Sequence, residues 1–426
     1  MHMTGTNNMT DGVYDSLFSR LCKLGAEQWQ YERSVINLIA SDNALPVSQS
    51  AKPPYCGHMI QEGLRGRRPF AGAAIHDEME ALAEAAACRV FDAEHANLQP
   101  HSCSQANQAV YHALLSRGDN VLALGFRDGG HLTHGLSSNF SGKSYRFTSF
   151  GTDINGYIDY SQVNDAARST RPRLIVCGSS SYPRFYDAAA LRAIADDVNA
   201  QLMFDLSHEG GLIAGGVFPN LIPVADVSTM SLDKTLRGPF GGLILCRAGL
   251  AAGIDRGVHP GTQSSFPIRK LTDAAHALIL THTPAFRDYA RRVLENAKAL
   301  EKSFSSSGAT MLTGGTDKHY LVLNVYRSFS LTGEEAERRL EDVGILASRQ
   351  TLSTDISARS KDASGLRLGT PWITSRGYST SDVEQTAAIV LAVLSTEPDR
   401  ANLKALKGHV TEITAQQRPL DAWGTP

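Results

Sequence analysis

LMFDLSHEGGLIAGG at residues 202–216 and ADVSTMSLDKTLRGPFGGLILC at residues 225–246 are the stretches around which the chain is organised. Each begins with a short apolar run and then turns polar. The first run is followed by Asp205 and His208, and the second by Lys234. Short apolar runs between glycine-rich and polar turns are typical of buried parallel strands. In an open α/β sheet the chemistry lies beyond the carboxyl ends of such strands, so we expect an acid and a lysine at one sheet edge.

This acid and lysine are the pair that pyridoxal 5′-phosphate (PLP) requires. The lysine would hold the cofactor as a Schiff base, and the carboxylate would keep the pyridine nitrogen protonated, so that the ring withdraws electrons. A lone acid after a strand is more commonly a turn or helix cap, and a lone lysine is usually a solvated charge. Lys234 lies between two apolar runs, which disfavours the solvated interpretation. The rest of the chain has to supply the phosphate and substrate sites.

The composition allows a large core and excludes several classes of partner. The chain has 426 residues and a net charge of -2, which predicts about two or three domains and no basic field for nucleic acid or membranes. The polar N-terminus lacks a signal-peptide layout, and no run of about 18 apolar residues is present. The six cysteines show no CxxC pairing. We therefore expect a cytoplasmic protein without a metal site or a disulfide scaffold.

Expected strands alternate with helical segments through the first two thirds of the chain. This alternation predicts an α/β protein with a doubly wound, mostly parallel sheet. A helix over residues 187–198 lies between two of the strands. The strands are expected at residues 120–125, 174–178, 202–205, 226–230 and 242–246.

The remainder of the chain predicts a smaller α+β unit. A helical stretch at residues 272–304, broken near Pro284, links the two parts, and a strand is expected at 319–326. The helix over residues 12–34 is expected to pack either on a partner subunit or on its own chain. The expected regions are an N-terminal arm at residues 1–35, a large domain at 36–290 and a small C-terminal domain at 291–426.

Residues 101–104, HSCS, lead directly into a helix that we expect over residues 105–116. Ser102, Cys103 and Ser104 therefore lie at a helix N-terminus, where free N–H groups and the helix dipole favour a phosphate. Ordinary capping by serine is an equal alternative on this stretch alone.

A glycine-rich loop, FRDGGHLTHG at residues 126–135, follows the first expected strand. The glycine pair would leave room for a ligand to approach the backbone. His131 comes directly after the pair and is a candidate to stack on a cofactor ring. The alternative is a loop histidine that makes one backbone hydrogen bond.

In combination, these motifs resemble the serine hydroxymethyltransferase family, within the aspartate-aminotransferase (type I) fold group of PLP enzymes. The resemblance runs from about residue 36 to residue 394. It implies PLP and a type I fold, with a mostly parallel seven-stranded sheet in the large domain and a small α+β C-terminal domain. The motifs are NLIASDN, ANLQPHSCSQAN, GGHLTHG, NFSGK, DLSHEGGLIAGG, DKTLRGPFGG, GGTDKHY and SGLRLGTP.

The resemblance also implies roles for individual residues. Lys234 resembles the Schiff-base lysine, Asp205 the partner of the pyridine nitrogen, and Arg367 the clamp for the substrate carboxylate. The expected catalytic residues are Lys234, His131, Glu62 and His208. The expected cofactor ligands are Ser102, Cys103, Ser104, His131, Ser180, Asp205, His208, Ser231, Lys234, Ser264 and Ser265. The expected substrate ligands are Ser41 and Arg367. The resemblance further implies a homodimer or larger oligomer with its active site at the subunit interface.

Several positions depart from the family pattern. Ile60 replaces a tyrosine two residues before Glu62, and Pro69-Phe70 replaces a tyrosine pair. Thr351 stands about where an asparagine near the folate pterin is expected. Asp233 replaces a histidine beside the Schiff-base lysine, and Ser264-Ser265 replaces a glycine pair that meets the neighbouring subunit's phosphate. Most polar partners of folate are therefore missing, while the groups for chemistry at Cα are kept.

These departures favour a folate-independent enzyme acting at Cα of a bulky amino acid in antibiotic or other secondary metabolism. Among such relatives, the chain most resembles the PLP enzymes of lincosamide biosynthesis. Those enzymes act on an S-cysteinyl sugar conjugate, by C–S β-elimination or by decarboxylation with oxidative deamination. One alternative is an L-threonine transaldolase, which residues 127–131 and 205–218 resemble but the missing tyrosine disfavours. The other is a serine/glycine hydroxymethyltransferase with an altered folate pocket.

Overall fold

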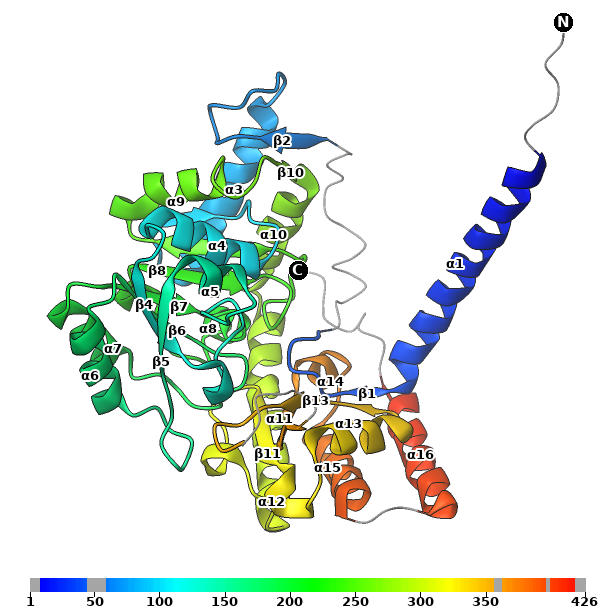
Figure 1. The fold of residues 1–426 in the computed structure, drawn as a ribbon. Helices are drawn as coiled ribbons and strands as arrows, with labels where there is room; N and C mark the ends of the chain where they lie inside the picture. The colour runs from blue at the N-terminus through cyan, green and yellow to red at the C-terminus, as the bar shows by residue number, and fades with distance from the viewer. Residues whose placement is uncertain (1–7, 44–58, 356–361, 396–398, 418–426) are drawn as a thin grey trace, which may run out of the picture.

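A computed structural model describes residues 8–43, 59–355, 362–395 and 399–417 (Figure 1). Its centre is a seven-stranded sheet in the order β3-β9-β8-β7-β6-β4-β5. All neighbours pair in parallel except β9, which runs antiparallel to β8 and β3. The predicted α/β fold with a mostly parallel seven-stranded sheet is confirmed. The strands are β3 (His95–Asn97), β4 (Asn120–Leu124), β5 (Arg146–Phe150), β6 (Leu174–Gly178), β7 (Gln201–Asp205), β8 (Val227–Ser231) and β9 (Gly242–Cys246).

Both faces of this sheet are covered by helices. Within β7, Leu202 and Phe204 belong to one hydrophobic cluster and Met203 to another, because successive side chains point to opposite faces. Burial on both sides explains why the central strands read as continuous apolar runs. The Met203 face is covered by α4 (Cys103–Leu114) and α9 (Ala251–Val258). The opposite face is covered by α3 (Ala74–Phe91), α6 (Tyr160–Thr170), α7 (Ala188–Asp197), α8 (Gly210–Ala214) and α10 (Ile268–Leu280).

The C-terminal part forms a third hydrophobic cluster around a three-stranded antiparallel sheet in the order β11-β14-β13. Two short strands, β1 (Ile36–Asn37) and β12 (Ile345–Leu346), pair in parallel beside it. The sheet strands are β11 (Tyr320–Asn324), β13 (Ser348–Gln350) and β14 (Gly365–Gly369). The helices are α11 (Pro284–Ser306), α12 (Val325–Phe329), α13 (Gly333–Asp342), α14 (Pro371–Ser375), α15 (Thr380–Ser395) and α16 (Arg400–Ala415). The expected domain division at residue 290 falls inside α11 and stays a prediction.

The strand expected at residues 319–326 ends early, at Asn324. The Asn324 side chain accepts a hydrogen bond from the Arg327 N–H at 2.9 Å and so caps a short helix, α12. This local capping outweighs the apolar pattern of the last two residues. Other boundaries follow their sequence signals, as in α13, where Thr332 and Glu335 form a capping box.

Two elements lie apart from these clusters. The N-terminal helix α1 (Asn8–Ser34) extends away from the body and has α16 as its neighbour (Figure 1). Its apolar side chains Leu17, Phe18 and Leu21 are exposed. A second small sheet pairs β2 (Ile60–Glu62) with β10 (Ser265–Pro267) in antiparallel fashion. No described helix is long and apolar enough to cross a membrane.

Candidate active site

A cavity of about 310 Å³ lies where β6, β7 and β8 end. Asp205 and Ser231 are the last residues of β7 and β8, so the cavity occupies the carboxyl edge that the sequence predicted. The expected site residues that line it are Ser41, Ser102, Cys103, Ser104, His131, Ser180, Asp205, His208, Ser231 and Lys234. Five further residues line the cavity for which the sequence predicted no site role: Asp42, Ser179, Ser207, Asp233 and Phe240.

The Asp205 carboxylate is the most densely hydrogen-bonded group of the cavity. Its Oδ1 accepts from Ser207 Oγ at 2.5 Å, and its Oδ2 accepts from Asn107 Nδ2 at 2.9 Å and faces His134 Nε2 at 3.2 Å. Burial alone would raise the pKa of Asp205, but the hydrogen bond and charge of His134, with His131 and Ser207, hold that pKa well below its usual range. The group is therefore an anion at neutral pH.

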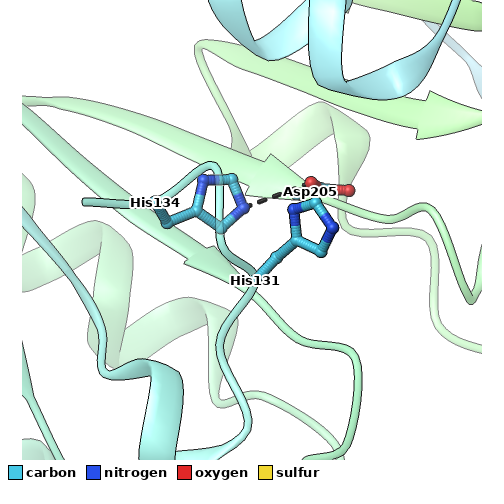
Figure 2. Close-up of side chains that lie close together, drawn as sticks. All are labelled: His131, His134 and Asp205. Atoms are coloured by element: carbon cyan, nitrogen blue, oxygen red, sulfur yellow. Dashed lines mark hydrogen bonds and ion pairs between the residues drawn. The ribbon is translucent and has the colours of Figure 1, made fainter. Parts of the chain in front are cut away.

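His134 is a site residue that the sequence analysis missed (Figure 2). Its second ring nitrogen, Nδ1, lies 2.6 Å from the Tyr111 hydroxyl. One ligand atom each from His131, His134 and Asp205 lies within 4.8 Å of the others, a spacing that also suits a cation. Because both nitrogens of His134 are already engaged, we interpret this trio as support for the carboxylate. The sequence signal that could have identified His134 is its place as the second histidine of the GGHLTHG motif.

Asn107 is the other missed residue, and it joins four parts of the fold. It comes from α4, and its Nδ2 donates to Thr133 Oγ1 at 2.9 Å as well as to Asp205. Its Oδ1 accepts from Thr229 Oγ1 on β8 at 2.6 Å. The side chain is completely buried. One amide therefore fixes the carboxylate relative to α4, β8 and the loop after β4.

Lys234 lines the same cavity from the turn after β8. Burial, followed by the charge of Arg367, lowers the pKa of Lys234, although Asp205 acts in the opposite direction. A lower pKa increases the share of neutral amine, which is the nucleophilic form. The lysine's backbone carbonyl accepts from Asn43 Nδ2 at 2.9 Å, which fixes the turn.

The start of α4 forms one wall of the cavity. Ser102 caps the helix, since its Oγ accepts from the Gln105 N–H at 3.2 Å. Capping is thus confirmed, and a phosphate at Ser102 and Ser104 stays a prediction. A Cβ on Gly242 would lie 2.4 Å from the Ser102 carbonyl oxygen, so glycine at the start of β9 lets this strand approach the cap.

His131 lines the cavity, and burial lowers its pKa to about 4, so the ring is neutral at neutral pH. The glycine pair before it serves a different purpose from the one expected. A Cβ on Gly129 would lie 2.7 Å from the Tyr182 nitrogen, and one on Gly130 would lie 2.2 Å from the Leu124 carbonyl oxygen. The chain's own backbone therefore packs too closely on both glycines for any larger residue.

Arg367 reaches the cavity wall from β14. Its Nη1 donates to the Ser180 carbonyl oxygen, and its guanidinium carbon lies 5.9 Å from the Tyr320 ring centre. Within the described residues its buried Nε has no partner. A buried guanidinium with a free donor suits an anionic ligand such as a carboxylate.

Besides Arg367, which contacts the cavity wall without lining the cavity, three expected site residues lie away from the cavity of their own chain. Glu62 and Ser265 are paired residues of the β2–β10 sheet, and Ser264 directly precedes β10. Glu62 Oε1 lies 3.6 Å from His259 Nε2. The single chain therefore separates these residues from Lys234 and Asp205.

Comparison with known proteins agrees with this arrangement. The sequence model of the family described as serine hydroxymethyltransferase matches residues 19–390. A serine hydroxymethyltransferase of Coprothermobacter proteolyticus is 39% identical over 394 residues, which cover 92% of this chain and 94% of that protein. Enzymes of this family use PLP, so the expected cofactor and the expected enzyme class are confirmed.

The cavity residues fit PLP. Lys234 offers the amine that would carry the covalent link, and Asp205 is a buried anion that would hold a proton at the ring nitrogen. The α4 N-terminus would receive the phosphate, and the neutral His131 ring would face the cofactor ring. When bound, PLP supplies an electron sink for negative charge at the substrate Cα.

Replacing Lys234 by Ala should abolish turnover and the visible absorption of the lysine-linked cofactor, because the amine that carries the link is gone. Absorption spectra of the purified variant after addition of PLP test this expectation. Lys298→Ala is the matched control, since its side chain is 55% exposed and lies outside the cavity. A Lys234→Ala enzyme that keeps the lysine-linked spectrum would refute the assignment.

The free energy of unfolding should fall as the pH is lowered from 6.5 to about 4, in part because of His131. Burial lowers the pKa of His131 from 6.5 to about 4, so the unfolded chain binds a proton in this window while the folded protein does not. Each pH unit in the window is worth roughly 1.4 kcal/mol for a fully buried group, and less for His131, which is partly exposed. Urea unfolding at pH 7 and pH 5 should therefore show a smaller loss for His131→Asn than for the wild type. His409→Asn, at an exposed histidine, should behave like the wild type; equal losses in all three proteins would contradict the expectation.

Proposed function

The chain belongs to the serine hydroxymethyltransferase family, and from that premise we propose that it acts at Cα of a bulky amino acid without using tetrahydrofolate. The observation that carries the proposal is a contrast within the site. Apart from Ser264 and Ser265, the residues expected to hold PLP and an amino acid line or border one cavity. The positions where the family resemblance implies folate contacts carry Ile60, Pro69, Phe70 and Thr351.

Capture of the amino acid rests on Arg367 and Ser41. The free Nε of the buried Arg367 guanidinium would bind the substrate carboxylate, with Ser41 at the same cavity. Lys234, whose pKa burial lowers, is the group that would move a proton at Cα. His208 lines the cavity as a second polar group, and burial together with the charge of Lys234 lowers its pKa well below the usual value.

The surroundings of the site favour a large substrate. Phe240 lines the cavity and is 73% exposed, so it presents an apolar ring at the entrance. Ile60 and Phe70 are exposed apolar side chains in the same part of the sequence as Glu62. Replacing hydroxyl groups by these side chains removes hydrogen-bond partners and leaves an apolar surface. Such a surface suits a bulky side chain better than a pterin, which has several polar groups to satisfy.

The segment that resembles the pterin loop also supports the proposal. Thr351 is only 6% exposed, and it offers a short hydroxyl in place of an amide. Its neighbours Leu352, Ser353 and Thr354 line a separate cavity of about 380 Å³ together with Tyr157. None of these residues lines the cavity that holds Lys234 and Asp205.

In its narrowest form, the proposal is an enzyme of antibiotic biosynthesis that acts on an S-cysteinyl conjugate, as the lincosamide-type enzymes do. The reaction would be C–S β-elimination, which is redox-neutral, or decarboxylation with oxidative deamination, which would also need an external two-electron oxidant such as dioxygen. An L-threonine transaldolase is less favoured, because Ile60 offers no hydroxyl for retro-aldol cleavage. We also propose a cytoplasmic location, which the free cysteines of the described residues support: Cys22, Cys88, Cys103, Cys177 and Cys246.

A second candidate function is hydroxymethyl transfer between serine and glycine. The observation in its favour is the 39% identity with the Coprothermobacter proteolyticus enzyme over 92% of this chain. Glu62, which resembles the acid–base glutamate of the family, is present in both interpretations. The two candidates differ in their need for tetrahydrofolate.

We further propose a homodimer or larger oligomer with its active site at the subunit interface. Glu62, Ser264 and Ser265 lie outside their own chain's cavity and would act in a neighbour's. The apolar side chains of α1, including Phe18 at 69% exposure, need a cover that the described chain does not supply.

Tetrahydrofolate should neither bind tightly nor accelerate turnover. Each buried polar group left unpaired costs roughly 1–3 kcal/mol, so two or three missing partners weaken binding by orders of magnitude. Calorimetric titration of tetrahydrofolate into the PLP-loaded enzyme, with glycine present, measures this affinity. The triple variant Ile60→Tyr, Pro69→Tyr, Phe70→Tyr is the matched comparison and should bind more tightly. Micromolar affinity in the wild type, with serine converted to glycine at a normal enzymatic rate, would restore hydroxymethyl transfer as the function.

The wild-type protein should sediment at twice its chain mass of 45.9 kDa or more. Introducing charge on α1 by Phe18→Asp and Leu21→Asp should shift the distribution toward the monomer, because buried carboxylates oppose association. Leu82→Asp, at another exposed leucine, is the control and should leave the oligomer intact. A fully active wild-type monomer in analytical ultracentrifugation would refute the proposed interface site.

A further inference from the structure

A fully buried ion pair lies directly behind the cavity. Lys318 Nζ and Glu209 Oε1 are 2.6 Å apart, and both side chains are 0% exposed. Removing two charges from water is expensive, and a well-packed apolar pair of similar volume is often as stable. Stability alone therefore does not explain why these two positions carry charged side chains.

The Lys318 ammonium also contacts a residue of the cavity wall. Nζ donates to Ser179 Oγ at 3.3 Å and to the Tyr186 hydroxyl at 3.2 Å. Glu209 is its third partner, as an ion pair, and within the described residues neither carboxylate oxygen of Glu209 has a hydrogen-bond partner. The Tyr186 hydroxyl in turn donates to Ser179 Oγ at 2.6 Å. Ser179 lines the cavity, so Lys318 fixes the wall from behind without reaching the ligand space.

The ion pair joins two segments that carry the site. Glu209 directly follows His208 in the turn after β7, and Lys318 directly precedes His319, at the entry to β11. The two histidines lie side by side, with 3.2 Å between His208 Nδ1 and His319 Nε2. The two segments are thus connected twice, once by charge and once by the imidazoles.

Arg367 lies on the strand that pairs with β11. Strand β11, which begins two residues after Lys318, pairs with β14 so that Val322 lies opposite Arg367. On the other side, Arg367 donates to the carbonyl of Ser180, next to Ser179. The Lys318 contacts and the Arg367 contact therefore attach the same β-sheet to neighbouring residues of the cavity wall.

We propose that Glu209 and Lys318 are positioning residues for the substrate carboxylate. The buried ion pair holds β14, the strand that carries Arg367, close to Ser179 and Ser180. In this position Arg367 binds the carboxylate. The inference rests on the proposed function in one respect, since it takes Arg367 as the carboxylate ligand. Neither Glu209 nor Lys318 touches the substrate.

The test uses the PLP-loaded enzyme and glycine, the smallest amino acid with both a carboxylate and an amine. The glycine dissociation constant is read from the change in cofactor absorption, the PLP dissociation constant from titration of the apoenzyme, and the stability from urea unfolding. The variants are Lys318→Met, Glu209→Gln and the double variant Glu209→Leu with Lys318→Met. Asp317→Asn is the matched control, because Asp317 pairs with Arg184 at 2.9 Å, next to Lys318 in sequence.

The single variants should weaken glycine binding by roughly tenfold or more, and PLP binding by less than about threefold. The double variant should regain stability, because its apolar side chains leave no unpaired charge. Its glycine affinity should stay low, because the contacts with Ser179 and Tyr186 are lost. Asp317→Asn should bind glycine within about threefold of the wild type.

A double variant with wild-type stability and wild-type glycine affinity would overturn the inference, since the ion pair would then be a structural feature alone. That variant decides the question even if the single variants fail to fold. Wild-type enzyme that does not bind glycine would overturn the proposed amino-acid site as well. The two failures are therefore distinguishable, because only the second affects the wild type.

Discussion

A carboxylate has to stay ionised at the buried end of β7, and much of the site follows from this constraint. Burial opposes the charge of Asp205, so the surrounding groups have to supply hydrogen bonds and positive charge. They come from α4 through Asn107, from the loop after β4 through His134, and from the turn after β7 through Ser207. Each of these elements must be in place before the anion is stable. The fold and the chemistry of the cavity are thus specified by the same contacts.

The positions of the strands and of most cavity residues were predictable because their signals are local. A strand ends where an apolar run gives way to polar residues, as at Asp205 and at the turn that carries Lys234. The carboxyl ends of parallel strands meet at one edge of a sheet, so these residues were expected to lie together. Asn107 and Tyr111 carried no comparable signal. Both lie in α4, where such residues are commonly part of the core. Their function depends on contacts with residues far away in the sequence.

Other features depend on partners that local patterns do not reveal. The Glu209–Lys318 pair joins residues 109 positions apart in the sequence, and each residue alone reads as a surface charge. The position of Glu62 is another such feature, because the pairing of β2 with β10 places it away from the cavity of its own chain. The glycine pair before His131 packs closely on Leu124 and Tyr182, a requirement that the sequence did not reveal.

We propose that Asp205 is a permanent anion that keeps the ring nitrogen of PLP protonated. The most direct test is the nitrogen-15 chemical shift of the cofactor ring in enzyme reconstituted with ring-labelled PLP, measured across neutral pH. The wild type should show the shift of a protonated pyridine nitrogen, and Asp205→Ala should show that of an unprotonated nitrogen. An unprotonated nitrogen in the wild-type enzyme would refute this role of Asp205.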